Sequence, residues 1–322
     1  MRHIELSNGI KITTFDQPPS GFNPLTAQAA ELTRYGFPTM VPDPHHQQRY
    51  KSVMQKLSGK FNYVQPTFEV HPDKFHKPLI NGANGKKNKA LGTKTGATAA
   101  GTETDTNWAG GVVFAPANDS FKWVEGDWVV PNVGAPAQNQ WFYSASWIGM
   151  DGDGSGDVCQ AGVECEVYQS GSSISRNIYT WWEWYPLPEV KLTNFAANPG
   201  DLITMILCSA SGAGSTSATV FMTNRTSGAS TSFGFNAPSG TKLVGNSAEW
   251  IVEAPTVGGS QSAIADYGEV FFSVCEAVTA KGVTINGGTG DNINMTAGGT
   301  VVSAGNLITP TVVQCYYEGT LA

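Results

Sequence analysis

From residue 107 onward, the chain is built from short strand-like runs that recur every ten to fifteen residues. Gly, Pro, Asn and Ser separate the runs, and helix signals are almost absent. Many short strands joined by tight turns are typical of antiparallel sandwiches and jelly rolls, so we expect an all-β fold with two packed sheets. The expected strands cover 107–116, 121–133, 140–151, 158–169, 174–186, 201–210, 217–224, 230–236, 247–254, 267–278, 291–296 and 307–317.

Charge divides the chain near residue 106. Residues 1–106 contain thirteen Lys/Arg and eight Asp/Glu, a net charge of +5. The remainder contains six Lys/Arg and eighteen Asp/Glu, a net charge of −12, and all five histidines lie in the first part. The sequence therefore predicts a basic leader over 1–81 and an acidic, histidine-free domain over 107–322, which we call the body. Residues 82–106, rich in Gly, Lys, Thr and Ala, are expected to form a flexible exposed linker.

The leader has helix signals. Asn23-Pro24 predicts the start of one helix, which Gly36 ends, and Asp43-Pro44 predicts the start of a second. The second helix is expected to pack an apolar stripe on the body. The stripe consists of Tyr50, Val53, Met54 and Leu57. The leader is then either a tethered extension or a propeptide that is cut off within the linker.

Several classes of protein are excluded by missing residues. Without histidine, the body has no Ser-His or Cys-His pair and no H-E-x-x-H zinc motif. The five cysteines include no C-x-x-C, and their odd number prevents complete pairing within the chain. No apolar run is long enough to span a membrane. We expect no metal, cofactor, nucleic acid or membrane as a partner, and chemistry based on carboxylates, amides, aromatics and hydroxyls.

Three of the expected strands place an unusual mixture of side chains on one face. Side chains two apart on a strand point the same way. A buried sheet face does not normally tolerate aromatics, an amide and carboxylates together, so this face predicts a binding or catalytic cleft. The set is Tyr143, Ala145, Trp147, Gly149, Asp151, Gln160, Gly162, Glu164, Trp181, Glu183 and Tyr185.

Two acidic segments have ordinary interpretations on pattern alone. The run D-G-D-G-S-G-D at 151–157 resembles the start of a calcium loop, but Gly162 stands where that loop needs a bidentate Glu. A tight turn is therefore favoured, with calcium binding as the alternative. In 247–255, Trp250 and its same-face neighbours suit the core, and Glu253 on the opposite face is expected to be solvated.

Five motifs of the body resemble those of the glutamic peptidases, or eqolisins, and follow that family's order over about two-thirds of the chain. They are N-W-A-G-G at 107–111, W-I-G-M-D-G at 147–152, Q-A-G-V-E at 160–164, W-W-E-W-Y-P at 181–186 and A-E-W-I-V-E at 248–253. The resemblance implies a concanavalin-like jelly roll with a cleft on its concave sheet. The sequence departs from the family at Glu164 and Tyr179, where fungal members have Asp.

The resemblance also implies site residues. It makes Gln160 and Glu253 catalytic, with Glu253 as the general base for water and Gln160 donating to the carbonyl oxygen that becomes negative. A base with an ordinary glutamate pKa of about 4.3 works best in acid. The residues expected to bind substrate are Trp108, Trp147, Asp151, Glu164, Trp181, Glu183 and Tyr185.

These expectations describe an acid-acting endopeptidase in proenzyme form. Its partners would be protein or peptide substrates and its own leader, which inhibits until acid-triggered cleavage within 82–106. We expect a monomer in an acidic extracellular environment, although the first ten residues lack the apolar core of a secretory signal. Two alternatives are a sugar-binding jelly-roll module and a glycoside hydrolase with two carboxylates, for example Glu183 and Glu253.

Overall fold

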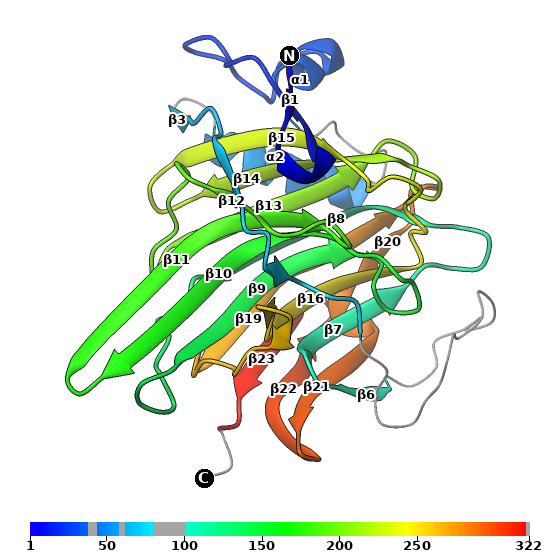
Figure 1. The fold of residues 1–322 in the computed structure, drawn as a ribbon. Coiled ribbons are helices and arrows are strands. Elements are labelled where there is room, and N and C mark those ends of the chain that lie inside the picture. The colour runs from blue at the N-terminus through cyan, green and yellow to red at the C-terminus, as the bar shows by residue number, and fades with distance from the viewer. Residues whose placement is uncertain (38–43, 58–61, 80–100, 320–322) are drawn as a thin grey trace.

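The computed structural model describes residues 1–37, 44–57, 62–79 and 101–319. Strands predominate, and twenty of them form one continuous sheet that folds back into two layers (Figure 1). The first layer contains, in spatial order, β4 (Phe68–Val70), β12 (Val190–Leu192), β11 (Ser173–Trp184), β10 (Cys159–Ser170), β9 (Trp141–Met150), β16 (Ser247–Glu253), β7 (Trp108–Phe114) and β21 (Asp291–Ala297).

The second layer packs against the first and is joined to it at one edge. It contains, in spatial order, β1 (Arg2–Glu5), β2 (Lys11–Thr14), β15 (Ala229–Asn236), β14 (Ser217–Asn224), β13 (Leu202–Ser209), β8 (Phe121–Val129), β19 (Glu269–Thr279) and β23 (Val312–Tyr317). The join is β22 (Thr300–Thr309), which pairs with both β21 and β23. The other strands of the large sheet are β3 (Asn62–Tyr63), β6 (Thr102–Asp105) and β20 (Thr284–Asn286). A small separate sheet contains β5 (Lys74–Phe75), β17 (Thr256–Val257) and β18 (Ser260–Gln261). Short 3₁₀ turns lie at Ser7–Gly9 and Gly287–Thr289.

One large hydrophobic core lies between the layers. Trp182 of β11 stacks on Phe235 of β15 with ring centroids 4.2 Å apart, although these strands are not neighbours in the sheet. Trp250 of β16 donates from Nε1 to the Glu125 carbonyl of β8 over 2.8 Å. Alternation predicted a core position for Trp250, and both tryptophans belong to this core. The all-β sandwich expected from the sequence is therefore confirmed.

Strands occur in all twelve expected regions, with differences at the ends. The prediction of a single strand over 307–317 is wrong, because a turn at residues 310–311 separates β22 from β23. Most of β22 was not expected, since only its residues 307–309 lay in an expected region. The strand β6, the short strands β12, β17, β18 and β20 and the strands of the leader were not expected either. All five cysteines are free.

The leader packs against both layers rather than lying apart from them. The β1–β2 hairpin extends the second layer at β15, and β4 extends the first layer at β12. Helices α1 (Ala29–Arg34) and α2 (Pro44–Leu57) bury Leu32, Tyr50 and Met54 beside Trp123 and Phe221 on the outer face of the second layer. No helix among the described residues is both long and apolar enough to cross a membrane.

Two boundaries of the leader differ from expectation. Helix α1 begins at Ala29, because Pro24 and the two residues after it form a turn. Helix α2 begins at Pro44 as expected, whereas the side chains of Val53 and Leu57 lie outside the described residues. Of the expected linker, residues 82–100 also lie outside them. The prediction of a flexible linker is wrong for Thr102–Asp105, because these residues form β6 and pair in parallel with β21.

Candidate functional site

The outward face of β7, β9, β10, β11 and β16, which we call the site face, brings the two catalytic candidates together. Gln160 pairs with Gly149 of β9, and Glu253 pairs with Ala145 of the same strand. Directly paired residues share a face, and residues 145 and 149 also point the same way because they are four apart. Gln160 and Glu253 therefore lie on one face, and the alternation predicted for these strands is confirmed.

Large aromatic side chains cover the middle of the site face. Trp108 and Trp147 meet edge to face, with ring centroids 4.8 Å apart, and both are fully buried. Trp181 is also fully buried in this cluster, and Tyr185 packs half-buried at its edge. The structure thus brings four of the residues expected to bind substrate close to Glu253 and Gln160.

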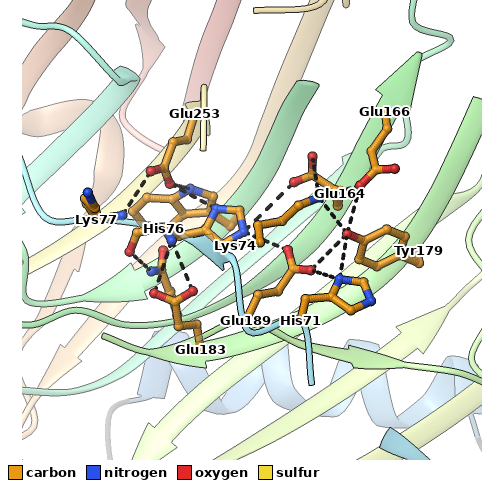
Figure 2. A network of polar contacts seen from close by, with 12 residues as sticks. His71, Lys74, His76, Lys77, Glu164, Glu166, Tyr179, Glu183, Glu189 and Glu253 are labelled. Atoms are coloured by element: carbon orange, nitrogen blue, oxygen red, sulfur yellow. Dashed lines mark hydrogen bonds and ion pairs between the residues drawn. The ribbon is translucent and has the colours of Figure 1, made fainter. Parts of the chain in front are cut away.

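A segment of the leader, residues 71–79, lies over the site face (Figure 1). Its strand β5 pairs with β17, which holds the segment extended. His76 is fully buried there, and its ring stacks on Trp181 with centroids 3.6 Å apart and planes 8° apart. Figure 2 shows His76 in the midst of glutamate side chains from the body.

The peptide bond between His76 and Lys77 lies between the two catalytic candidates. Gln160 Nε2 donates to the His76 carbonyl oxygen over 2.7 Å. On the other side of the same bond, the Lys77 N–H donates to Glu253 Oε1 over 3.1 Å. One amide donor and one carboxylate acceptor therefore flank a single peptide bond of the leader.

Both oxygens of Glu253 are fully engaged. Oε1 also accepts from Asn107 Nδ2 over 3.3 Å, and Oε2 accepts from Trp147 Nε1 over 3.0 Å and lies 3.3 Å from His76 Nδ1. A carboxylate has about four acceptor positions, and the four donors fill them. Burial raises the pKa of Glu253, and the hydrogen bonds from His76, Asn107 and Trp147 partly offset that rise. The expectation of a solvated Glu253 is wrong, because the leader covers it.

His76 is held by carboxylates on several sides. Its Nε2 lies 2.9 Å from Glu189, and its backbone N–H donates to both oxygens of Glu183 over 3.1 and 3.0 Å. Burial by itself would lower the pKa of His76, but Glu189, Glu253 and Glu183 outweigh it and raise that pKa to about 10. The imidazole is therefore a cation in the docked leader. Burial raises the pKa of Glu183 well above its ordinary value.

Lys74 places a second leader cation on the site face (Figure 2). Its ammonium pairs with Glu166, donates to the Tyr179 hydroxyl over 2.8 Å and lies 3.6 Å from Glu164. Burial alone would lower the pKa of Lys74, but Glu164, Glu189 and Glu166 outweigh it and raise the pKa. Both positions at which the sequence departs from the glutamic peptidase pattern, Glu164 and Tyr179, thus contact this lysine.

One group of side chains has the spacing of metal ligands. Ligand atoms of His76, Glu164 and Glu189 all lie within 4.8 Å of one another. The Lys74 ammonium lies 3.6 Å from Glu164, and His76 is itself cationic. This arrangement favours ion pairing over metal binding in the docked state.

Asp151 binds a neighbouring loop. Its buried carboxylate accepts from the backbone N–H groups of Val244, Gly245 and Asn246 over 2.7, 2.6 and 3.1 Å. Asp157, at the other end of the acidic turn, accepts from Trp184 Nε1 over 3.0 Å. Asp151 and Asp157 therefore bind separate protein donors, which favours the tight turn over a calcium loop.

Several members of the site were missed from the sequence. Lys74 and His76 were treated only as part of a basic leader, and Glu189 lay between predicted strands. Asn107 was quoted within a motif without a role. Their clustering depends on pairings between segments far apart in sequence, such as β4 with β12 and β5 with β17. The net basic charge of the leader was the one signal that pointed to its two residues, Lys74 and His76.

Comparison with known proteins gives one family. Residues 106–317 match the Peptidase A4 family. The chain is 30% identical over 226 residues to Aspergillopepsin-2 from Aspergillus niger. This alignment covers 65% of this chain and 74% of that protein. It is 25% identical over 152 residues to Scytalidopepsin B from Scytalidium lignicola, which covers 46% of this chain and 52% of that protein.

A solved structure has the same fold. Scytalido-glutamic peptidase with a transition state analog inhibitor matches with a TM-score of 0.56 and 22% identity, over 66% of this chain and 98% of that one. A second solved structure, SCP-B of the eqolisin family in complex with the tripeptide Ala-Ile-His, matches with a TM-score of 0.51 and 21% identity. The resemblance inferred from the five motifs is confirmed by these matches.

Proposed function

Because the chain belongs to the peptidase A4 family, we propose that this glutamic-type endopeptidase uses Glu253 and Gln160 as its catalytic pair. The observation that carries the proposal is the position of these two side chains on either side of the His76–Lys77 peptide bond. A substrate that follows the path of the leader would place its cleaved bond in the same position.

The reaction follows from this geometry. Glu253 takes a proton from water, the water oxygen bonds to the carbonyl carbon, and the carbonyl π electrons move to its oxygen. Gln160 Nε2, 2.7 Å from the equivalent oxygen in the leader, donates to the resulting negative charge. The carbon–nitrogen bond then breaks, and the proton on Glu253 passes to the leaving nitrogen, whose counterpart in Lys77 lies 3.1 Å away.

Side chains around the pair would bind the rest of the substrate. Trp108, Trp147 and Trp181 offer a large apolar surface, which Tyr185 extends. Glu183, which accepts from the His76 N–H, would bind the N–H before the cleaved bond. Glu164 would face side chains further toward the substrate N-terminus. Asp151 would act indirectly by holding the loop at residues 244–246.

The leader would be an inhibitory propeptide. It fills the position of a substrate, and the four donors on Glu253 leave no acceptor position for the attacking water. Lys74 and His76 neutralise glutamates of the acidic body, which is how a basic leader would recognise it. Thr102–Asp105 pair with β21, Gly101 donates to Asp291, and Asn107 contacts Glu253. Removal of the leader would therefore cut the chain before Gly101.

Acidification is expected to weaken leader docking through Glu189. Burial alone would raise the pKa of Glu189, but Lys74, His71 and His76 outweigh it and hold the pKa below its usual range. A carboxylate with a lowered pKa stabilises the docked state fully above its undocked pKa, about 4.3. This stabilisation declines as the pH falls below that value and is lost as the pH falls through the lowered pKa of the docked state. His76 acts in the opposite direction because its pKa is raised. It stabilises the docked state fully below about pH 6.5, and this stabilisation is lost as the pH rises toward about 10.

The measurement is incubation of the purified chain at about pH 3 and about pH 7, on either side of the ordinary glutamate pKa, followed by sequencing of the new N-termini. New termini between Lys77 and Gly101 are expected in acid only. The Glu253→Gln chain, treated identically, should stay intact if the cleavage is autocatalytic. Equal cleavage of the wild-type chain at both pH values, or at neither, would overturn acid-triggered release.

The His76→Ala chain is expected to lose its leader faster than the wild type. The substitution removes the contacts of the imidazole with Glu189, Glu253 and Trp181, and hydrogen bonds to charged groups are typically worth tenfold or more in an equilibrium. The rate of appearance of the processed chain at about pH 5, just above the ordinary glutamate pKa, is the readout. The matched control is His3→Ala, an exposed leader histidine, and equal rates for the two variants would count against a specific role of His76.

A further inference from the structure

Asn107 contacts both the base and the chain segment that occupies the site. It lies between β6 and β7 and is almost fully buried. Its Nδ2 atom lies 3.3 Å from Glu253 Oε1 and 3.1 Å from the carbonyl oxygen of Lys77, the residue after the flanked bond. A side-chain amide carries two N–H donors, so one Asn can serve both acceptors at once.

The backbone around Asn107 is fixed by Asp105. Asp105 Oδ1 accepts from the N–H groups of Thr106 and Asn107 over 2.6 and 2.9 Å, and the side chain is buried. The Asp105 carbonyl accepts from Thr296 Oγ1 over 3.1 Å, and the Asn107 carbonyl accepts from the Ala254 N–H over 2.9 Å. Hydrogen bonds of the Asp105 side chain, the Asp105 carbonyl and the Asn107 carbonyl therefore fix the turn that carries Asn107.

We propose that Asn107 is a positioning residue of the reaction. Its amide orients the Glu253 carboxylate and binds the carbonyl oxygen of the substrate residue after the cleaved bond, and Asp105 holds it in place. This inference rests on the proposed function of Glu253 as the base.

The chemistry suits an enzyme that works in acid. An amide does not titrate, so Asn107 keeps its donors at every pH at which Glu253 changes its protonation. A donor to the charged form of a carboxylate lowers its pKa, and the Asn107 hydrogen bond has this effect on the pKa of Glu253. Loss of the donor would raise that pKa and move the acid limb of the pH–rate profile to higher pH, since the base must be deprotonated to act.

The test compares variants that carry a protease site between residues 82 and 100, so that every leader is cut in the same way. We expect Asn107→Ala to lower kcat/KM on a denatured protein by roughly ten- to a hundredfold, the range typical for a lost hydrogen bond to a charged group, and to shift the acid limb upward. The Asn107→Leu variant keeps a similar side-chain size without any donor and should behave alike. Asp105→Ala should also lower kcat/KM and shift the acid limb upward. Asp105→Asn still accepts from both N–H groups, so it should keep wild-type kcat/KM and the wild-type position of the acid limb.

Asn292→Ala is the matched control for a purely structural role. Asn292 bonds to Thr102 Oγ1 across the β6–β21 pair and makes no contact with Glu253. It should lower the melting temperature without moving the acid limb. Wild-type kcat/KM and an unmoved limb in Asn107→Ala or Asn107→Leu would overturn the role of Asn107 and leave the proposed function intact. Full activity of Glu253→Gln would instead overturn the proposed function, and this inference with it.

Discussion

The Glu253→Gln variant is expected to hydrolyse peptide bonds about 10²–10⁴-fold more slowly than the wild-type chain, the usual contribution of a positioned general base. The amide has the size of the carboxylate but cannot accept the proton from water. It can still accept hydrogen bonds through its oxygen, so the fold should persist. The measurement is kcat/KM on a denatured protein in acid, with the leader of both chains cut at an introduced protease site between residues 82 and 100.

The control for this variant is Glu269→Gln, an exposed glutamate of β19, which should retain wild-type kcat/KM. Thermal unfolding of both variants shows whether the fold is retained. Activity within a few-fold of the wild type in Glu253→Gln would remove Glu253 from the role of base, whatever its place in the hydrogen-bond network.

The Gln160→Ala variant is expected to lose about 10²–10³-fold in kcat, as is typical when one donor to a developing oxyanion is removed. The loss should fall on kcat more than on KM, because the donor matters most when the oxygen carries charge. The matched control is Gln169→Ala on the same strand, since Gln169 bonds to the Gly171 carbonyl near the β10–β11 turn, away from Glu253.

This variant also separates the peptidase from the carbohydrate-directed alternatives. A glycoside hydrolase that used Glu183 and Glu253 would depend on both carboxylates and tolerate loss of an amide. A sugar-binding module would cleave nothing in any variant. Unchanged kcat in Gln160→Ala, with full loss in Glu183→Gln, would therefore contradict the proposed pair.

Local patterns were enough to predict most of the long strands of the body and the faces they present. Alternation over two residues is a property of the strand itself, so Trp250 was placed in the core and Gln160 on the site face before any pairing was known. The same rule fails beyond a strand end. Asp151 follows β9 with a φ of 70°, and this backbone turn directs its carboxylate to a neighbouring loop.

What the sequence did not predict depends on distant segments. Glu253 was expected in solvent, but a leader segment 177 residues earlier in the chain covers it. The composition of β6 indicated a linker, and it becomes a strand only through its parallel pairing with β21. Lys74 and His76 had no motif to mark them, and their contacts follow from the register of β5 on β17. Such contacts between remote segments leave no local periodicity to read.

The most direct test of the catalytic pair is the crystal structure of the Glu253→Gln chain, with its leader removed, bound to a peptide whose cleaved bond is known from wild-type digestion. We expect Gln160 Nε2 about 2.7–3.1 Å from the carbonyl oxygen of that bond, with residue 253 on the side of its leaving nitrogen. A carbonyl that faces away from Gln160, or a peptide bound off the site face, would contradict the assignment.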